Sequence, residues 1–328
     1  MVRKTIKRII EKISENKRFL ITAHVNLEGD ALGSELAMYI LLKKLKKKAV
    51  IYNNDLTPQI YSFLPFTRVI KSNLKDESFD VAIALDCSDS SRAGRVKDTL
   101  GKAKCIINID HHISNTYFGD INWVNPQAGS TAQMLYKLCE KIKIMDRDIA
   151  FCLYTGIFTD TGNFTYANTD SETHRIVSDL MKYGLYPNKI YENLHSLCTP
   201  QDLVFIGRII SSLKFDSEKK ICWANITHWQ DKNYDLTEVI FSIMRLLKGV
   251  EVFLLFKKID ATRTRVNFRS CSRIDVDRVA KFFGGGGHRR ASWTTIGEPL
   301  ATAEKKVISF LKKYTNGLKK KRLAYIKA

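Results

Sequence analysis

The first 110 residues alternate between short, nearly continuous apolar runs and a longer segment with apolar residues at helical spacing. The apolar runs at 18–24, 48–54, 79–86 and 103–110 predict β-strands, and the segment at 31–45 predicts a helix between the first two. Strands that are apolar on both faces and alternate with helices are typical of a parallel sheet covered on both sides. The pattern therefore predicts an α/β domain built on a parallel sheet.

The pattern changes in the second half of the chain. Helical spacing continues at 129–143, 147–159, 171–183 and 199–215. Strands are then predicted at 219–227, 250–259 and 264–271, followed by a helix at 276–283, four glycines, a further strand and a last helix that ends in a basic tail. We expect a helix-flanked N-terminal domain at 1–190, a linker helix at 191–216, and a smaller α/β C-terminal domain at 217–328.

Composition agrees with a globular protein of about two domains. The chain has 328 residues, of which 45% are hydrophobic and 27% charged. Its net charge is +19, which favours anionic partners such as nucleic acid or nucleotides. Most of the excess charge lies in three segments outside the motifs described below, at 1–18, 43–48 and 301–328.

The same survey bears on location. No apolar run approaches 18 residues, so no membrane-spanning helix is expected. The basic N-terminal segment is patterned as an amphipathic helix and not as a signal peptide. Seven cysteines without close pairs indicate reduced thiols, and we expect a cytoplasmic protein with no membrane partner.

Candidate metal ligands follow the predicted strands. His24 ends the first run, Asp86 ends the third, and Asp110 and His111 end the fourth. In open α/β sheets these carboxyl ends share one edge, where ligands bind. Clustered carboxylates need cations, and His with carboxylate but no thiolate suits Mn²⁺ or Mg²⁺. Two such ions side by side cleave phosphoesters, and six candidates suit two ions: His24, Glu28, Asp30, Asp86, His111 and Asp160.

A glycine stretch at 284–287 lies in the second half of the chain and precedes His288. Successive backbone N–H groups of glycines can form a nest for an anion, whereas the alternative is a flexible turn. Arg269 and Ser270 upstream favour the anion site, because a guanidinium suits bidentate recognition of phosphate.

The motifs HVNLEGDALGS, ALDCSDSSRAG, NIDHH and GIFTDTGNF resemble those of the DHH phosphoesterase superfamily. NFRSCSRIDVDRVAKFFGGGGHRRAS resembles its DHHA1 substrate-binding domain, so the resemblance spans about residues 18–300. In size and motif order the chain is similar to the stand-alone oligoribonuclease and pAp-phosphatase (nanoRNase) members. One position departs from the pattern: Glu28 stands where the first motif usually has Asp.

The resemblance implies a role for each matched residue. One Mn²⁺ would be held by His24, Glu28 and Asp86, and the other by Asp30, Asp86, His111 and Asp160. Asp110 would orient His111, and His112 would face the scissile phosphate. Substrate binding would fall to residues of the C-terminal domain, namely Arg269, Ser270, Gly285, Gly286, Gly287 and His288.

The implied activity is a two-Mn²⁺ phosphoesterase, with Mg²⁺ or another divalent ion as the alternative cofactor. It would hydrolyse short single-stranded oligoribonucleotides to mononucleotides with water as the nucleophile, and the conversion of pAp to AMP stays open. A cyclic-dinucleotide or linear dinucleotide phosphodiesterase is the nearest alternative. A non-catalytic nucleotide- or RNA-binding protein is the alternative of another class. The sequence leaves a homodimer open.

Overall fold

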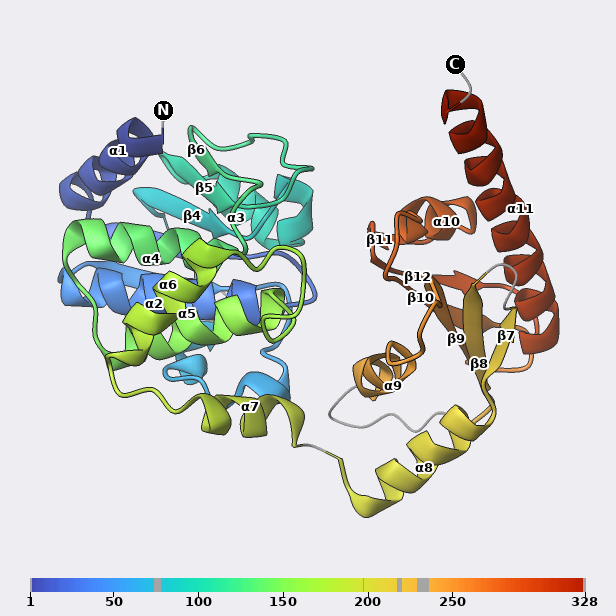
Figure 1. Ribbon diagram of the computed structural model, residues 1–328. Helices are drawn as coiled ribbons and strands as arrows, with labels where there is room; N and C mark the ends of the chain where they lie inside the picture. Colours follow the sequence, from blue (N-terminus) through green and yellow to red (C-terminus); the bar gives the residue numbers. More distant parts are fainter. Residues whose placement is uncertain (1, 74–77, 197, 217–219, 229–235, 327–328) are drawn as a thin grey trace. The chain divides into compact units, whose positions relative to one another are not determined.

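The computed structural model describes residues 2–73, 78–196, 198–216, 220–228 and 236–326, with the backbone alone at 2, 288 and 316–326. The chain divides into two compact units, Met1–Ser196 and Leu197–Ala328, and each is described by itself (Figure 1). Among the described residues, neither unit has a helix long and apolar enough to cross a bilayer.

The first unit is built on a six-stranded sheet in the order β3-β2-β1-β4-β5-β6, and every neighbouring pair is parallel. The predicted parallel sheet is thus confirmed. The four apolar runs form β1, β2, β4 and β5, whereas the short strands β3 and β6 were not predicted. The strands are β1 (Arg18–Thr22), β2 (Lys48–Tyr52), β3 (Ile70–Lys71), β4 (Val81–Leu85), β5 (Ile106–Asp110) and β6 (Ile121–Val124).

Helices cover both faces of this sheet. Alternate residues of the strands point to opposite sides, so their apolar side chains need a covering layer on each side. Phe19 and Ile21 of β1 pack into the larger core with residues of α2, α4 and α5, while Leu20 packs with Val96 and Leu100 of α3. The helices of this unit are α1 (Val2–Glu15), α2 (Gly29–Lys44), α3 (Val96–Gly101), α4 (Thr131–Ile142), α5 (Arg147–Asp160), α6 (Ser171–Met181) and α7 (Pro187–His195).

Two glycines let α2, α4 and α5 approach closely. A Cβ on Gly33 of α2 would overlap the backbone carbonyl oxygen of Cys152 in α5. A Cβ on Gly156 of α5 would lie 2.7 Å from the Cβ of Ala132 in α4 and 3.1 Å from an oxygen of Asp30 in α2. The ends of these three helices therefore meet, and this contact brings Asp30 to the candidate site.

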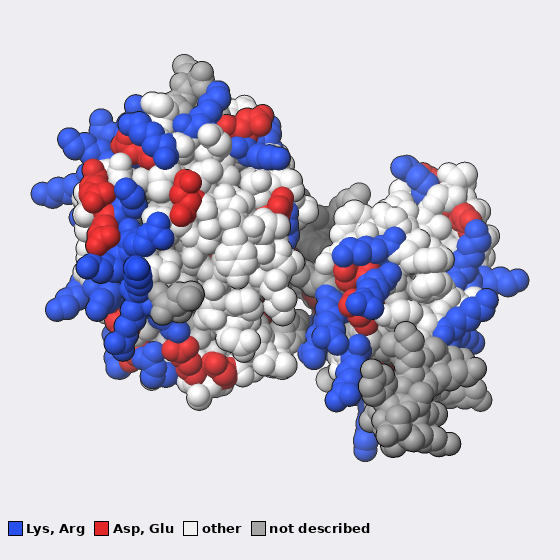
Figure 2. Space-filling view, turned by 90° about the horizontal axis from the view of Figure 1, so that it is seen from above, with Lys and Arg blue, Asp and Glu red and all other residues white. Residues whose placement is uncertain are grey.

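A basic flank, made by residues 12–18 and 43–48, lies at the amino ends of the strands. Arg18 and Lys48 are register partners at the starts of β1 and β2. Lys47 Nζ donates to the carbonyl oxygen of Ser14 at 2.7 Å, which joins the two segments. Figure 2 shows Lys and Arg crowded along one flank of the first unit, with Asp and Glu between them.

The second unit contains a mixed sheet in the order β11-β12-β10-β9-β8-β7, in which only β8 and β9 pair in parallel. Helices α10 and α11 pack on one face and α8 and α9 on the other, so the helix expected as a linker packs within this unit. Its elements are α8 (Pro200–Ser211), β7 (Lys214–Asp216), β8 (Ile221–Ile226), α9 (Thr237–Met244), β9 (Val252–Lys258), β10 (Thr264–Ser270), α10 (Val276–Phe282), β11 (Gly286–His288), β12 (Ala291–Ile296) and α11 (Leu300–Ile326).

Candidate metal centre

The candidate metal centre lies at the carboxyl edge of the parallel sheet. His24 follows β1, Asp86 follows β4, and Asp110 ends β5. Asp30 lies in the first turn of α2, and Asp160 is the last residue of α5. Because the strands are parallel, their carboxyl ends meet at one edge, and the two helix ends close over it.

Asp86 is the central residue of the centre. Its Oδ2 lies 3.4 Å from His24 Nε2, whereas its Oδ1 lies 3.5 Å from His111 Nε2 and 3.6 Å from His112 Nδ1. The backbone of Asp86 is left-handed, with φ of 55°, while its N–H still donates to the Ile109 carbonyl. The two oxygens of one buried carboxylate therefore face different histidines, which is the geometry of a bridging ligand.

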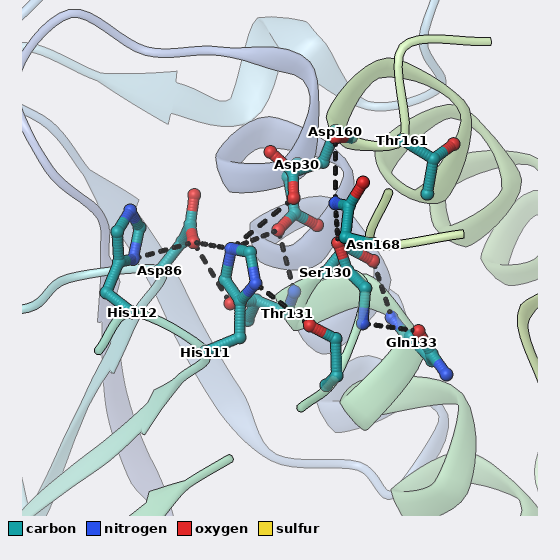
Figure 3. A network of polar contacts seen from close by, with 12 residues as sticks. Asp30, Asp86, His111, His112, Ser130, Thr131, Gln133, Asp160, Thr161 and Asn168 are labelled. Carbon is teal, nitrogen blue, oxygen red and sulfur yellow. Dashed lines mark hydrogen bonds and ion pairs between the residues drawn. The ribbon is translucent and has the colours of Figure 1, made fainter. Parts of the chain in front are cut away.

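His111 points its Nε2 toward three carboxylates. This nitrogen lies 3.5 Å from Asp160 Oδ2 and 3.9 Å from Asp30 Oδ2, in addition to its contact with Asp86 (Figure 3). On the other side of the ring, Nδ1 lies 3.2 Å from the Ala128 carbonyl oxygen. Since a carbonyl can only accept, Nδ1 carries a proton, and Nε2 is the ring nitrogen that faces the carboxylates.

The amino end of α4 holds Asp30 in place. Its two carboxylate oxygens accept hydrogen bonds from Thr131 N at 2.7 Å and Ala132 N at 2.8 Å. A helix amino terminus stabilises negative charge, because its first N–H groups have no partner within the helix. The Thr131 hydroxyl in turn donates to Asp86 Oδ1 at 3.0 Å. Thr131 thus contacts two candidate ligands.

The carboxylates of the centre repel one another. Burial and the charges of Asp86 and Asp160 raise the pKa of Asp30 well above its usual value. Burial also raises the pKa of Asp160 to about 6, although His111 opposes the shift. Burial would lower the pKa of His111, but Asp160 and Asp86 outweigh it and raise that pKa to about 9. These carboxylates do not all ionise at neutral pH without added positive charge.

The residues present fit divalent cations. Ligand atoms lie within 4.8 Å of one another in two overlapping groups, Asp86 with His111 and His112, and Asp30 with His111 and Asp160. Carboxylate oxygens and neutral imidazole nitrogens suit Mn²⁺ and similar ions. His24 faces the remaining oxygen of Asp86. Glu28 is exposed and belongs to neither group, although its charge contributes to the raised pKa of Asp160.

One expectation about orientation is wrong. The buried Asp110 contacts His112 and not His111: its Oδ1 accepts from His112 Nδ1 at 2.7 Å. The other oxygen of Asp110 accepts from Asn115 Nδ2 at 2.6 Å. The Ala128 carbonyl takes the orienting role that was expected of Asp110 for His111. The buried carboxylate therefore positions the second histidine of the DHH sequence.

Sequence reasoning missed Glu35, which is fully buried in α2. Its Oε2 accepts from Asn53 Nδ2 at 2.8 Å, while Oε1 has no hydrogen-bond partner in the described part of the chain. Burial raises the pKa of Glu35 to about 8, against the opposing hydrogen bond from Asn53. Glutamate in an otherwise apolar helix carries no signal that separates this buried position from an exposed one.

The glycine stretch of the second unit forms an edge strand. Residues Gly286–His288 are β11 and pair with β12, where a loop had been expected. A Cβ on Gly285 would overlap the Trp293 carbonyl oxygen, and one on Gly287, whose φ is 147°, would lie 2.6 Å from the Ala291 carbonyl oxygen. Close packing on β12 thus accounts for these two glycines.

The other predicted substrate residues have partners within the second unit. Arg269 forms an ion pair with Glu238 of α9, and its guanidinium lies 4.9 Å from the Phe241 ring. Ser270 Oγ accepts from the backbone N–H of Ser272 at 3.2 Å. The side chain of His288 lies outside the described residues. A phosphate at Arg269 would therefore compete with Glu238.

Comparison with known proteins agrees with this architecture. Residues 18–157 match the model of the DHH family, N-terminal domain. A relative from Thermus thermophilus named bifunctional oligoribonuclease and PAP phosphatase NrnA is 30% identical over 277 residues, which cover 84% of this chain and 83% of the relative. The crystal structure of an exopolyphosphatase-related protein from Bacteroides fragilis is 25% identical and covers 97% of this chain with a TM-score of 0.88. RecJ from Thermus thermophilus, solved with Mn²⁺, shares the fold at a TM-score of 0.51 and 12% identity.

Proposed function

The chain belongs to the DHH family of phosphoesterases, and on that basis we propose that it is a two-metal hydrolase of short oligoribonucleotides. The bridging geometry of Asp86 carries the proposal, because its two oxygens face His24 on one side and His111 and His112 on the other. The Thermus relative, named for oligoribonuclease and PAP phosphatase activity, is similar over most of both chains. We propose the same substrates here, with pAp as the second.

The first unit supplies the groups that hold and surround the metals. One ion would be held by Asp30, Asp86, His111 and Asp160. The other would have Asp86 and His24 among its ligands. When bound, divalent ions supply the positive charge that activates water and neutralises a phosphoryl group. Backbone N–H groups of α4 fix Asp30, so this ligand needs little reorganisation. We propose Mn²⁺ as the ion, since the donors are oxygen and imidazole nitrogen.

His112 is placed to assist at the phosphate. Asp110 holds its Nδ1–H at 2.7 Å, and Asn115 in turn holds Asp110. The ring of His112 contacts that of His111, with centroids 4.9 Å apart, so it adjoins the metal ligands. We assign His112 to donate a hydrogen bond or proton to the scissile phosphate group. The seven unpaired cysteines are in keeping with the cytoplasm as the site of this activity.

The test is a substrate panel with the full chain. Oligoribonucleotides of two to five residues, pAp and a cyclic dinucleotide are incubated with Mn²⁺ or with EDTA. We expect mononucleotides from the oligoribonucleotides and AMP from pAp, with Mn²⁺ only. Faster hydrolysis of the cyclic dinucleotide would overturn the substrate assignment.

Two variants test the mechanism. Asp86→Asn keeps the shape of the side chain and removes the bridging charge, so we expect turnover to fall at least about 100-fold. Asp98→Asn removes an exposed carboxylate of α3 in the same unit and should leave turnover unchanged. Equal activity of the two variants would overturn the metal mechanism.

A further inference from the structure

One face of the second sheet carries a row of charged, polar and aromatic side chains. The antiparallel register of β10 and β12 pairs Arg265 with Thr295, Asn267 with Trp293, and Arg269 with Ala291. Directly paired residues share a face of the sheet. The alternate residues Val266 and Phe268 are buried against α10 and α11 on the opposite face. Arg265, Asn267, Arg269 and Trp293 therefore lie together on one face.

Trp293 is an exposed aromatic residue in this row. Its side chain is 45% exposed, although β12 is flanked by strands on both sides. The guanidinium of Arg265 lies 4.4 Å from the centroid of the indole ring. Exposed aromatic rings with arginines beside them are the usual stacking surface for bases of single-stranded nucleic acids. The guanidinium of Arg265 in the row favours an anionic ligand over an apolar peptide, whereas that of Arg269 is paired with Glu238.

Asn267 provides a second, independent observation. It lies next to Trp293 in the register, is only 7% exposed, and its Oδ1 has no hydrogen-bond partner among the described residues. A buried carbonyl oxygen without a donor is unfavourable, so each such atom calls for an explanation. The edge of a nucleobase carries N–H donors that would satisfy it.

We propose that Trp293, Asn267 and Arg265 form a nucleobase-binding site that extends the substrate path of this unit. The inference rests on the proposed function, because it names where a further base of the same oligonucleotide binds. The base stacks on the indole and donates an N–H to Asn267 Oδ1. Arg265, which covers the ring in the free protein, turns to the adjoining phosphate. Arg265 and Arg269 lie on the same strand roughly 7 Å to either side of Asn267, so both can contact one extended strand.

The test measures binding of oligoadenylates of two to five residues in EDTA, which prevents hydrolysis. We expect Trp293→Ala to bind the longer oligomers about 5- to 150-fold more weakly, the range of one lost base stack. Trp293→Phe should recover part of the loss, because it keeps an aromatic face. Phe215→Ala is the matched control, since Phe215 is an exposed aromatic residue of β7 in the same unit and should have no effect.

Oligomers with one abasic position separate stacking from a structural effect. The unmodified protein should bind the oligomer more weakly when the stacked base is removed. Trp293→Ala should bind the intact oligomer and the oligomer abasic at that position equally well. Equal loss in both proteins at every position, or unchanged binding by Trp293→Ala, would overturn the nucleobase site. Failure of the proposed function differs from both, because the unmodified protein would then release no mononucleotides with Mn²⁺.

Discussion

Mn²⁺ should stabilise the first unit, and Asp86→Asn should abolish the effect. Asp86 contacts His24, His111, His112 and Thr131 within 3.0–3.6 Å, so it lies between His24 and the other candidate ligands. A ligand at 100 times its Kd adds about 2.7 kcal/mol to the free energy of unfolding. For a unit the size of Met1–Ser196 this raises Tm by about 5–11 °C.

The stabilisation should also grow with pH. The pKa of Asp160 is raised to about 6 by burial, and that of Asp30 is raised well above its usual value for the same reason. A raised pKa in the folded state means that, without metal, stability is present below pH 4 and is lost as pH rises through about 6. Cations replace the missing protons, so the Mn²⁺ shift in Tm should be larger at pH 7.5 than at pH 5.5.

Thermal unfolding of protein freed of metal with EDTA, titrated with Mn²⁺ at both pH values, measures these shifts. Asp98→Asn is the matched control, because it removes an exposed carboxylate of the same unit. If Mn²⁺ raised the Tm of Asp86→Asn at the same concentration as it does for the unmodified protein, the reasoning would be refuted, since the ion would then bind elsewhere.

Three further predictions follow from the neighbours of the centre. Burial raises the pKa of Glu35 to about 8, so the unmodified protein should lose stability as pH rises from about 4.5 to 8. Glu35→Gln should flatten this dependence when the free energy of unfolding is measured in urea. Equal slopes of that free energy against pH in the two proteins would contradict the prediction. Asn115→Ala removes a hydrogen-bond donor to buried Asp110, which should lower the free energy of unfolding in urea by about 1–3 kcal/mol. It should also lower kcat, while the Mn²⁺ concentration at half-maximal activity stays constant. An unchanged kcat would show that His112 is held in place without Asn115. Gly33→Ala should cost about 1–3 kcal/mol by forcing α2 from α5, and calorimetry with an unaltered Tm would exclude that close contact.

Strong hydrophobic runs made much of the fold predictable. β1, β4 and β5 are buried along most of their length, so their sequences are largely apolar. β6 was missed because it is short and alternates between buried and half-buried residues. No element was predicted where α9 lies, since β-branched and aromatic residues in its sequence obscure helical spacing.

Part of the candidate site was predictable for a different reason. Residues at strand ends converge because parallel strands end at one edge, and this rule brought His24, Asp86 and His111 together. Contacts from distant segments were not predictable: the backbone N–H of Thr131 reaches Asp30 across 101 positions. Asp110 contacts His112 because of the way the chain turns after β5, and the sequence does not indicate the direction of this turn.

The basic flank and the metal centre lie at opposite ends of the same strands. β1 has five residues, so the two are separated by about 16 Å or more. RNA bound electrostatically at Arg18, Lys48 and their neighbours would therefore leave the carboxyl edge accessible. Long RNA bound at the flank is consequently expected to inhibit dinucleotide hydrolysis little, and its binding should respond to salt independently of turnover.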